Sequence, residues 1–265
     1  MKVTAFVGSA RKKHTYYATQ RFLQNLQKYG DIEYEIICLG DYHLKICRGC
    51  KLCTDKGEEF CPLKDDRDKL FDKIDHSDGV VFASPNYSFG VSGLMKVFLD
   101  RFGFIFHRPR FFGKAWSNIV VQGVYGGKKI NEYFNFIGNC LGFNVVKGCC
   151  VKSLEPMTEK DQRIFDSIID KQSKKFYKTL IRKEYRVPSF FELMMFRMAR
   201  TSMSLMLDET YRDYTYFKEK GWFESGFYYP VRLNLLKKVA GRFFDFLFTR
   251  IYGRGDKMEK SVVLN

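Results

Sequence analysis

The sequence lacks a hydrophobic run of roughly 18 residues, which is the length that a membrane-spanning helix needs. It also lacks an internal repeat and a low-complexity segment. The chain starts directly with an expected strand, so we expect no signal peptide and a cytoplasmic protein. In that compartment the 8 cysteines are not expected to form a disulfide framework.

The charge is strongly positive, but no compact basic block carries it. The net charge is +15, with 22 Lys and Arg against 15 Asp and Glu before residue 151 (+7) and 23 against 15 from there on (+8). This even spread favours a diffuse basic surface that meets anionic ligands over nucleic-acid binding. We therefore expect no nucleic-acid partner.

Strand and helix patterns alternate over the first two thirds of the chain. Apolar runs and helical spacing predict strands over 3–7, 32–39, 79–83, 116–121 and 143–148, and helices over 17–29, 65–75, 91–102, 128–141 and 158–183. This alternation predicts an α/β fold, with helices on both faces of a parallel sheet. We expect residues 1–183 to form a flavodoxin-like doubly wound domain with five strands, whose ligand lies at the carboxyl ends of the first and third. Residues 184–265 are expected to form a helical C-terminal extension.

The turn after the first strand has the composition of an anion site. Gly8 and Ser9 end the strand, cations follow, and a helical pattern begins near Thr15. The helix N-terminus offers free N–H groups, Ser9 and Thr15 offer hydroxyl donors, and Arg11 adds charge. The alternative is an ordinary strand-to-helix turn with Thr15 as its N-cap.

The loop after the third strand, 84–90, suits a planar heteroaromatic ring such as a flavin. Pro85 fixes the chain, the amides beyond it can face a ring edge, and Tyr87 and Phe89 offer flat apolar surface. The alternative is a proline-initiated turn with packed aromatic side chains. The segment 122–127, which contains Gly123, is a third candidate loop, whose flexible backbone can approach a ring closely.

Four cysteines lie in one compact segment with the spacing C-x2-C-x2-C-x7-C, namely Cys47, Cys50, Cys53 and Cys61. Spacing this compact is typical of chains that hold a cubane iron–sulfur cluster. A four-thiolate zinc site and a set of reduced thiols without metal remain alternatives. The other cysteines lie on or beside apolar segments and are expected to be small core residues.

The sequence changes character beyond Pro188. The segment 190–207 is rich in Met and Phe, and 233–252 has the pattern of a basic amphipathic helix. This part could be a lid over the ligand, a dimerisation arm or a membrane-surface helix. Helices that pack on their own domain or on a partner subunit are commoner, so the first two interpretations are preferred.

Three motifs together resemble the NADPH-dependent FMN reductase family. They are Gly8-Ser9-Ala10-Arg11 with Thr15, Ser84-Pro85-Asn86-Tyr87, and Gly93-Leu94-Met95-Lys96 with Asp100-Arg101. The cysteine motif followed by Lys64-Asp65-Asp66 is similar to the iron–sulfur flavoprotein branch. The resemblance covers residues 1–183 and implies one FMN per subunit in a homo-dimer or tetramer.

The resemblance also implies roles for particular residues. Ser9, Arg11 and Thr15 would bind the FMN phosphate, and His14 stands where relatives often carry Asn or a small residue. The isoalloxazine would be held by Pro85, Asn86, Tyr87, Ser88, Phe89 and Gly90. The four cysteines would bind a [4Fe-4S] cluster.

The expected function is that of an FMN-dependent oxidoreductase, which takes hydride from NAD(P)H or electrons from a ferredoxin-like donor. Because the redox chemistry belongs to the cofactor, no catalytic acid or base is nominated. One alternative is an electron-transfer iron–sulfur flavoprotein without a dedicated small-molecule substrate. Another is a basic binding module that uses the fold only as a scaffold.

Overall fold

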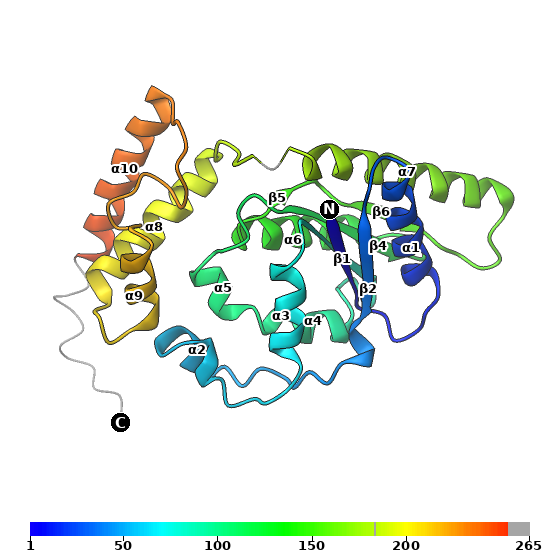
Figure 1. The fold of residues 1–265 in the computed structure, drawn as a ribbon, viewed down its shortest axis with the longest axis horizontal. Helices are drawn as coiled ribbons and strands as arrows, with labels where there is room; N and C mark the ends of the chain where they lie inside the picture. Colours follow the sequence, from blue (N-terminus) through cyan, green and yellow to red (C-terminus); the bar gives the residue numbers. More distant parts are fainter. Residues whose placement is uncertain (183, 254–265) are drawn as a thin grey trace. The chain divides into compact units, whose positions relative to one another are not determined.

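A computed structural model describes residues 1–182 and 184–253 (Figure 1). Lys183, at the expected domain boundary, and the tail 254–265 lie outside the described residues. The chain divides into two compact units. The α/β unit holds Met1–Arg48 and Leu63–Glu184, and the helical unit holds Gly49–Pro62 and the residues from Tyr185 onward.

The α/β unit is built on one parallel sheet, drawn as arrows in Figure 1. Its strands are β1 (Lys2–Val7), β2 (Glu33–Cys38), β3 (Gly79–Pro85), β4 (Ala115–Gln122), β5 (Asn144–Val145) and β6 (Cys149–Lys152). The strand order is β2-β1-β3-β4-β5, with β6 also paired to β4. This order confirms the predicted flavodoxin-like fold, because the chain reverses its direction of winding between β1 and β3.

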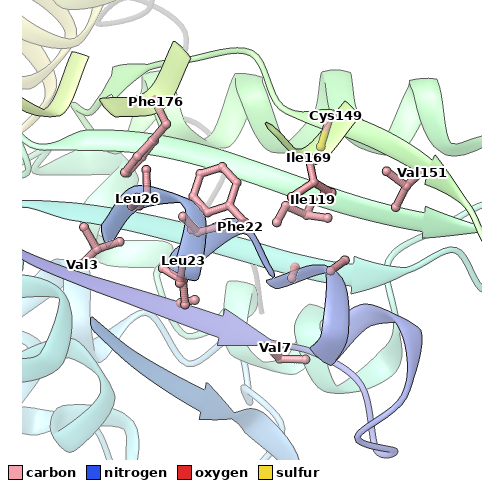
Figure 2. Packing of buried hydrophobic residues seen from close by; sticks show 14 of the residues in the cluster. Val3, Val7, Phe22, Leu23, Leu26, Ile119, Cys149, Val151, Ile169 and Phe176 are labelled. Carbon is pink, nitrogen blue, oxygen red and sulfur yellow. The ribbon is translucent and has the colours of Figure 1, made fainter. Parts of the chain in front are cut away.

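One face of the sheet is aliphatic. Alternate residues of β1, such as Val3 and Val7, join the core with helices α1 (His14–Gln27) and α7 (Glu159–Leu180) (Figure 2). Phe22 of α1 meets Phe176 of α7 edge-on, with ring centroids 5.5 Å apart. Every residue from Val3 to Val7 is fully buried, as expected of a strand covered on both faces.

The other face of the sheet is aromatic. The ring centroids of Phe6 on β1 and Phe82 on β3 lie 5.3 Å apart, and both rings contact Phe98. Trp116 of β4 lies 4.4 Å from Phe82. The remaining helices of this unit are α3 (Arg67–Asp75), α4 (Gly93–Asp100), α5 (Gly103–His107) and α6 (Gly127–Cys140), with a 3-10 turn at Leu39–Asp41.

The edge strand differs from the prediction, which ended it at residue 148. Its first part pairs Asn144 with Ala115, and its second part pairs Cys149 with Ile119. Three residues therefore stand opposite two of β4 between these stretches, which is the geometry of a β-bulge. Oδ1 of Asn135 accepts hydrogen bonds there from Gly148 N (3.2 Å) and Asn118 Nδ2 (2.9 Å). The strand thus continues to Lys152 and ends beside β4.

The helical unit contains short turns at Leu52–Asp55 (α2) and Glu58–Phe60, followed by α8 (Phe190–Met206), α9 (Arg212–Glu219) and α10 (Leu235–Tyr252). Ser189 and Glu192 form a capping box that starts α8. Helices α8 and α10 pack against each other. In the described part of the chain, no helix combines the length and the apolar character that crossing a bilayer requires.

Candidate functional site

A cavity of about 290 Å³ lies in the α/β unit where β1, β3 and β4 end. Its lining comes from the last residues of β3 and β4 and from the segments that follow β1, β3, β4 and β6. These residues are Ser9, Arg11, Lys13, His14 and Thr15, Pro85, Asn86 and Tyr87, Val121, Gln122 and Gly123, and Ser153, Leu154 and Glu155. The carboxyl edge of a doubly wound sheet is where such folds bind ligands. The first and third strands supply lining residues, as predicted from the sequence.

The first turn of α1 forms one wall of this cavity. Lys13 is the N-cap residue, and no described side chain caps the helix there. The buried hydroxyls of Ser9 and Thr15 lie beside this end of the helix, and Ser9 Oγ donates to Arg11 O at 2.9 Å. An uncapped helix N-terminus with adjacent hydroxyls and cations favours a bound anion.

The turn depends on a close approach at Gly8. A Cβ at this position would lie 2.7 Å from the Cβ of Met95 and 2.9 Å from Ser92 Oγ. Ser92 Oγ donates to Gly8 O and also caps α4 by accepting from Met95 N. The N-terminus of α4 is therefore pressed against the end of β1, and only glycine leaves room for it.

The cations of this wall have an acidic neighbour. His14 Nε2 lies 2.7 Å from Oε1 of Glu155, across the cavity lining. The hydrogen bond from His14, followed by the charge of Lys13, holds the pKa of Glu155 below its usual range. A carboxylate therefore contacts the cationic wall at neutral pH.

The loop after β3 is held by its own backbone. Asn86 N donates to Val121 O at 2.8 Å, and Asn86 Nδ2 donates to Tyr125 O at 2.9 Å. Tyr87 and Gly90 exchange two backbone hydrogen bonds of 3.0 and 2.9 Å. The amides of Asn86 and Tyr87, expected to face a ring edge, instead maintain the shape of the loop.

The tip of this loop is a strained turn. Ser88 (φ 48°) and Phe89 (φ 62°) both adopt the left-handed conformation, as the two central residues of a type I′ turn do. Such turns favour glycine or asparagine, and a phenylalanine there is strained. The Phe89 ring is 62% exposed and lies 5.4 Å from the Tyr125 ring.

The structure brings most of the predicted site residues to one cavity. Ser9, Arg11, His14, Thr15, Pro85, Asn86, Tyr87 and Gly123 line it, whereas Ser88, Phe89 and Gly90 lie in the adjoining turn. Lys13 and Gln122 belong to the predicted loops but were not predicted as site residues. Val121 and the whole wall formed by Ser153, Leu154 and Glu155 were not predicted. That wall follows from the extended edge strand, which ends at Lys152 and not at residue 148.

The missed wall contains an informative polar atom. Ser153 Oγ is buried, and no hydrogen-bond partner for it is found among the described residues. Buried hydroxyls normally have a partner. Because Ser153 lines the cavity, a polar ligand atom placed there would satisfy this hydroxyl.

The four cysteines of the predicted metal site are divided between the two units. Among the described residues, no three His, Cys, Asp or Glu side chains gather closely enough to hold a metal ion. Cys50, Cys53 and Cys61 belong to the helical unit, whereas Cys47 belongs to the α/β unit. A cluster on these four cysteines therefore stays a prediction from their spacing.

The base of the cysteine segment is anchored firmly. Asp65, buried at the end of the segment, forms an ion pair with the equally buried Arg101. Lys45 N donates to Asp65 Oδ2 at 2.9 Å, and Arg101 Nη1 donates to Lys45 O at 3.0 Å. Burial alone would raise the pKa of Asp65, but the hydrogen bonds from Arg101, Lys45 N and Arg67 N outweigh burial and lower it.

Comparison with known proteins gives a family match over the first part of the chain. The model of the NADPH-dependent FMN reductase family matches residues 1–153. An iron–sulfur flavoprotein from Archaeoglobus fulgidus is 33% identical over 159 residues, which cover 56% of this chain and 71% of the relative. One from Clostridioides difficile is 30% identical and covers 66% of this chain and 78% of the relative. For one from Methanocaldococcus jannaschii, 37% identical, the shares are 49% and 64%.

Solved structures show the same fold. A crystal structure of RosB with a bound intermediate, 8-demethyl-8-formylriboflavin-5'-phosphate, has a TM-score of 0.58 at 13% identity and covers 89% of this chain and 92% of that one. A flavone reductase has a TM-score of 0.53 at 20% identity, with 70% and 66% covered. Fold, motifs and relatives agree: this chain belongs to the NADPH-dependent FMN reductase family, in its iron–sulfur flavoprotein branch.

Proposed function

We propose that this chain is an FMN-dependent oxidoreductase that accepts hydride from NAD(P)H and passes electrons to a small-molecule acceptor. The observation that carries the proposal is one cavity with an anion-binding wall and an aromatic wall at the carboxyl edge of the sheet. The family match supports FMN as the cofactor. We further propose residues 1–183 as the FMN-binding domain and 184–265 as its helical extension.

The residues present fit the FMN phosphate. The first turn of α1, the hydroxyl of Thr15 and the guanidinium of Arg11 supply donors and positive charge at one end of the cavity. The Ser9 hydroxyl, which donates to Arg11 O in this structure, would rotate to donate to the phosphate. A phosphate dianion needs both donors and positive charge, because charge-assisted hydrogen bonds are about twice as strong as neutral ones. Lys13 adds a second cation to the same lining.

The residues present also fit a flavin ring. Tyr87 and Leu154 line the cavity with apolar surface, and the hydroxyl of Ser153 lies in the same lining. A planar heteroaromatic system needs flat apolar contact on its faces and polar partners at its edge. Pro85 and Gly123 bring backbone close to this space without a bulky side chain.

In this proposal the flavin supplies the hydride and electron transfer chemistry, and the chain binds, orients and shields it. Ser9, Arg11 and Thr15 would hold the phosphate and so fix the depth of the cofactor. Tyr87 would contact the ring, and Ser153 would donate to a polar atom at its edge. Phe89 and Tyr125, exposed beside the cavity, would flank an arriving acceptor.

Titration of the purified protein with FMN, followed by quenching of flavin fluorescence, tests the cavity. We expect one FMN per chain and about tenfold weaker binding in Arg11→Gln, which loses a charge-assisted hydrogen bond. Lys12→Gln is the matched control, because Lys12 carries the same charge next in the chain, pairs with Asp41 at 3.6 Å and does not line the cavity. No FMN binding, or equal losses in both variants, would refute the site.

Steady-state oxidation of NADH and NADPH tests the activity. We expect turnover in the presence of a small-molecule acceptor such as a quinone or free flavin. Bound FMN that is reduced once and is not turned over would instead favour the electron-transfer alternative. That outcome leaves the FMN site intact and rejects only the proposed reaction.

An iron–sulfur cluster on Cys47, Cys50, Cys53 and Cys61 is the second proposal for this chain. Its support is the spacing of the motif and the similarity to proteins named iron–sulfur flavoproteins. Because no metal-holding group of side chains is found among the described residues, no step of the reaction is derived through a cluster. With a cluster, electrons from a ferredoxin-like donor become an alternative to hydride from NAD(P)H.

Iron and sulfide analysis of anaerobically purified protein tests the cluster directly. We expect about four irons per chain, with loss in Cys50→Ser. Cys140→Ser is the control, because Cys140 lies on α6 outside the motif. Protein without iron would reject the cluster, and light scattering on the same sample tests the proposed homo-dimer or tetramer.

A further inference from the structure

Helix α10 of the helical unit has two apolar faces, and its neighbours in the unit bury one of them. Of its 18 residues, only Gly241 and Phe248 are buried. The inner face packs on α8, and the outer face is open. Figure 1 shows the two helices side by side, α8 in yellow and α10 in orange to red.

The inner face is closed by a close approach and by ion pairs. A Cβ at Gly241 would lie 3.1 Å from Nη2 of Arg197, so glycine lets α8 come close. Asp245 pairs with Arg197 and Arg200, each at 2.6 Å. The acidic side chain of α10 is therefore neutralised on the inner side.

The outer face carries an apolar stripe. Seven large apolar side chains on it are exposed, namely Leu235 (77%), Leu236 (71%), Val239 (58%), Phe243 (58%), Phe246 (64%), Leu247 (36%) and Ile251 (52%). Their spacing of three and four residues places them on one side of the helix. Apolar side chains exposed in such a contiguous set mark an interaction surface, whereas scattered ones do not.

The exposed charges on this helix are all positive. Lys238 and Arg242 lie along one border of the stripe, and Arg250 lies among its apolar side chains near the C-terminal end of the helix. All three are exposed. Lys237 lies on the other flank, with its ammonium 5.7 Å from the centre of the Phe190 ring. Asp245, the one acid of the helix, is held by α8.

We propose that α10 docks on an anionic lipid surface, lying in the plane of the interface with this stripe inserted and its cations at the headgroups. An apolar stripe bordered by Lys and Arg has the amphipathic pattern of interfacial helices. Its 18 residues span about 27 Å, enough to lay several large side chains into the interface.

Charge decides between a bilayer and a second copy of this helix. Two such stripes packed together would bring the cations of both copies around one apolar seam. The exposed face of α10 offers no carboxylate to pair with them, since Asp245 is engaged. An anionic headgroup layer supplies that missing negative charge and attracts Lys and Arg near the surface.

Co-sedimentation of the full-length protein with vesicles tests the proposal. We expect binding to vesicles of phosphatidylcholine mixed with phosphatidylglycerol and much weaker binding to phosphatidylcholine alone. Phe243→Glu should weaken binding at least about tenfold, because an inserted aromatic ring is replaced by a charge. A double variant, Lys238→Gln with Arg242→Gln, should weaken binding to the anionic vesicles about tenfold without affecting the fold.

Ile164→Glu is the matched control, because Ile164 is 51% exposed on another amphipathic helix, α7. It should bind vesicles as the wild type does. If circular dichroism shows that Phe243→Glu does not fold, vesicle binding by Phe246→Glu and by the double cation variant still tests the proposal. Any of three results overturns the proposal. The first is no vesicle binding by the wild type, and the second is equal binding to both lipid mixtures. The third is a wild type that does not bind vesicles but self-associates, with Phe243→Glu abolishing the self-association.

Discussion

The two units of this protein bury apolar surface in different ways. In the α/β unit, strands β1 and β3 are covered on both faces, and Val3, Phe6 and Phe82 are fully buried. In the helical unit, α10 buries one side against α8 and leaves the other exposed. The first unit buries its apolar strands and has a cavity with cationic and aromatic lining at the carboxyl edge of the sheet. The second presents an apolar surface that calls for a partner.

The two units carry different candidate functions: the cofactor cavity lies in the α/β unit, and the proposed membrane-binding stripe lies in the helical unit. The family match ends at residue 153, inside the α/β unit, which contains every residue of the cavity. No residue of the cavity belongs to the helical unit. The exposed stripe on α10 of that unit consists of apolar side chains with Lys and Arg beside them. We therefore expect substitutions in the two units to affect different measurements.

The largest expected difference concerns two phenylalanines. Phe22→Ala in the α/β unit should lower the free energy of unfolding by about 3–5 kcal/mol, because it opens a cavity beside Phe176. Phe246→Ala on the outer face of α10 should change it by no more than about 0.5 kcal/mol. Urea unfolding of both variants measures this. Equal losses would show that the outer face of α10 is packed and not open.

The second difference concerns two ion pairs. Asp65→Asn removes the carboxylate from the buried guanidinium of Arg101 and should lower the free energy of unfolding by about 3 kcal/mol. Asp245→Asn should lower it by about 1 kcal/mol, because Asp245 is 28% exposed. Chemical unfolding at neutral pH measures both, and a larger loss in Asp245→Asn contradicts the assignment.

The Asp65 pair also predicts a pH dependence. The folded state lowers the pKa of Asp65, so its stabilisation is fully present above the unfolded value of about 3.9. It is lost as the pH falls from there through the lower folded pKa. The wild type should therefore lose more unfolding free energy below about pH 4 than Asp65→Asn does.

The third difference concerns ligands. Glu155→Gln should strengthen FMN binding severalfold, because it removes a carboxylate that contacts His14 in the lining of the phosphate wall. It should leave vesicle binding unchanged, whereas Phe243→Glu should do the reverse. Fluorescence titration and co-sedimentation of both variants test this. A variant that alters both FMN binding and vesicle binding would contradict the claim that the two surfaces act independently.

The smallest expected effect is a matched pair of serine substitutions. Ser88→Gly should raise the free energy of unfolding by about 0.5–1 kcal/mol, because it relieves a left-handed residue. Ser202→Gly, inside α8 of the helical unit, should lower it by about 0.5 kcal/mol through lost helix propensity. Thermal unfolding in one buffer resolves the opposite signs, and a destabilised Ser88→Gly contradicts strain in the turn.

Much of the α/β unit could be predicted because its signals are local. Fully apolar runs such as 79–83 mark strands buried on both faces, and the turn at Gly8 marks where a helix must begin. The wall at Ser153 could not be predicted, because it depends on the bulge in the edge strand. The hydrogen bonds of Asn135 hold that bulge, and they come from a helix elsewhere in the sequence.

The sequence by itself determined the strands of the sheet, the two loops that form the main walls of the cavity, and the amphipathic character of the C-terminal helix. Tertiary structure decided which side of α10 is exposed, because Phe244 and Phe248 are as apolar as Phe243 and Phe246. The close approach of α8 at Gly241 and the ion pairs of Asp245 with Arg197 and Arg200 select the inner face. It also decided that residues 49–62 group with the C-terminal helices, since contacts between distant segments do not appear in local spacing.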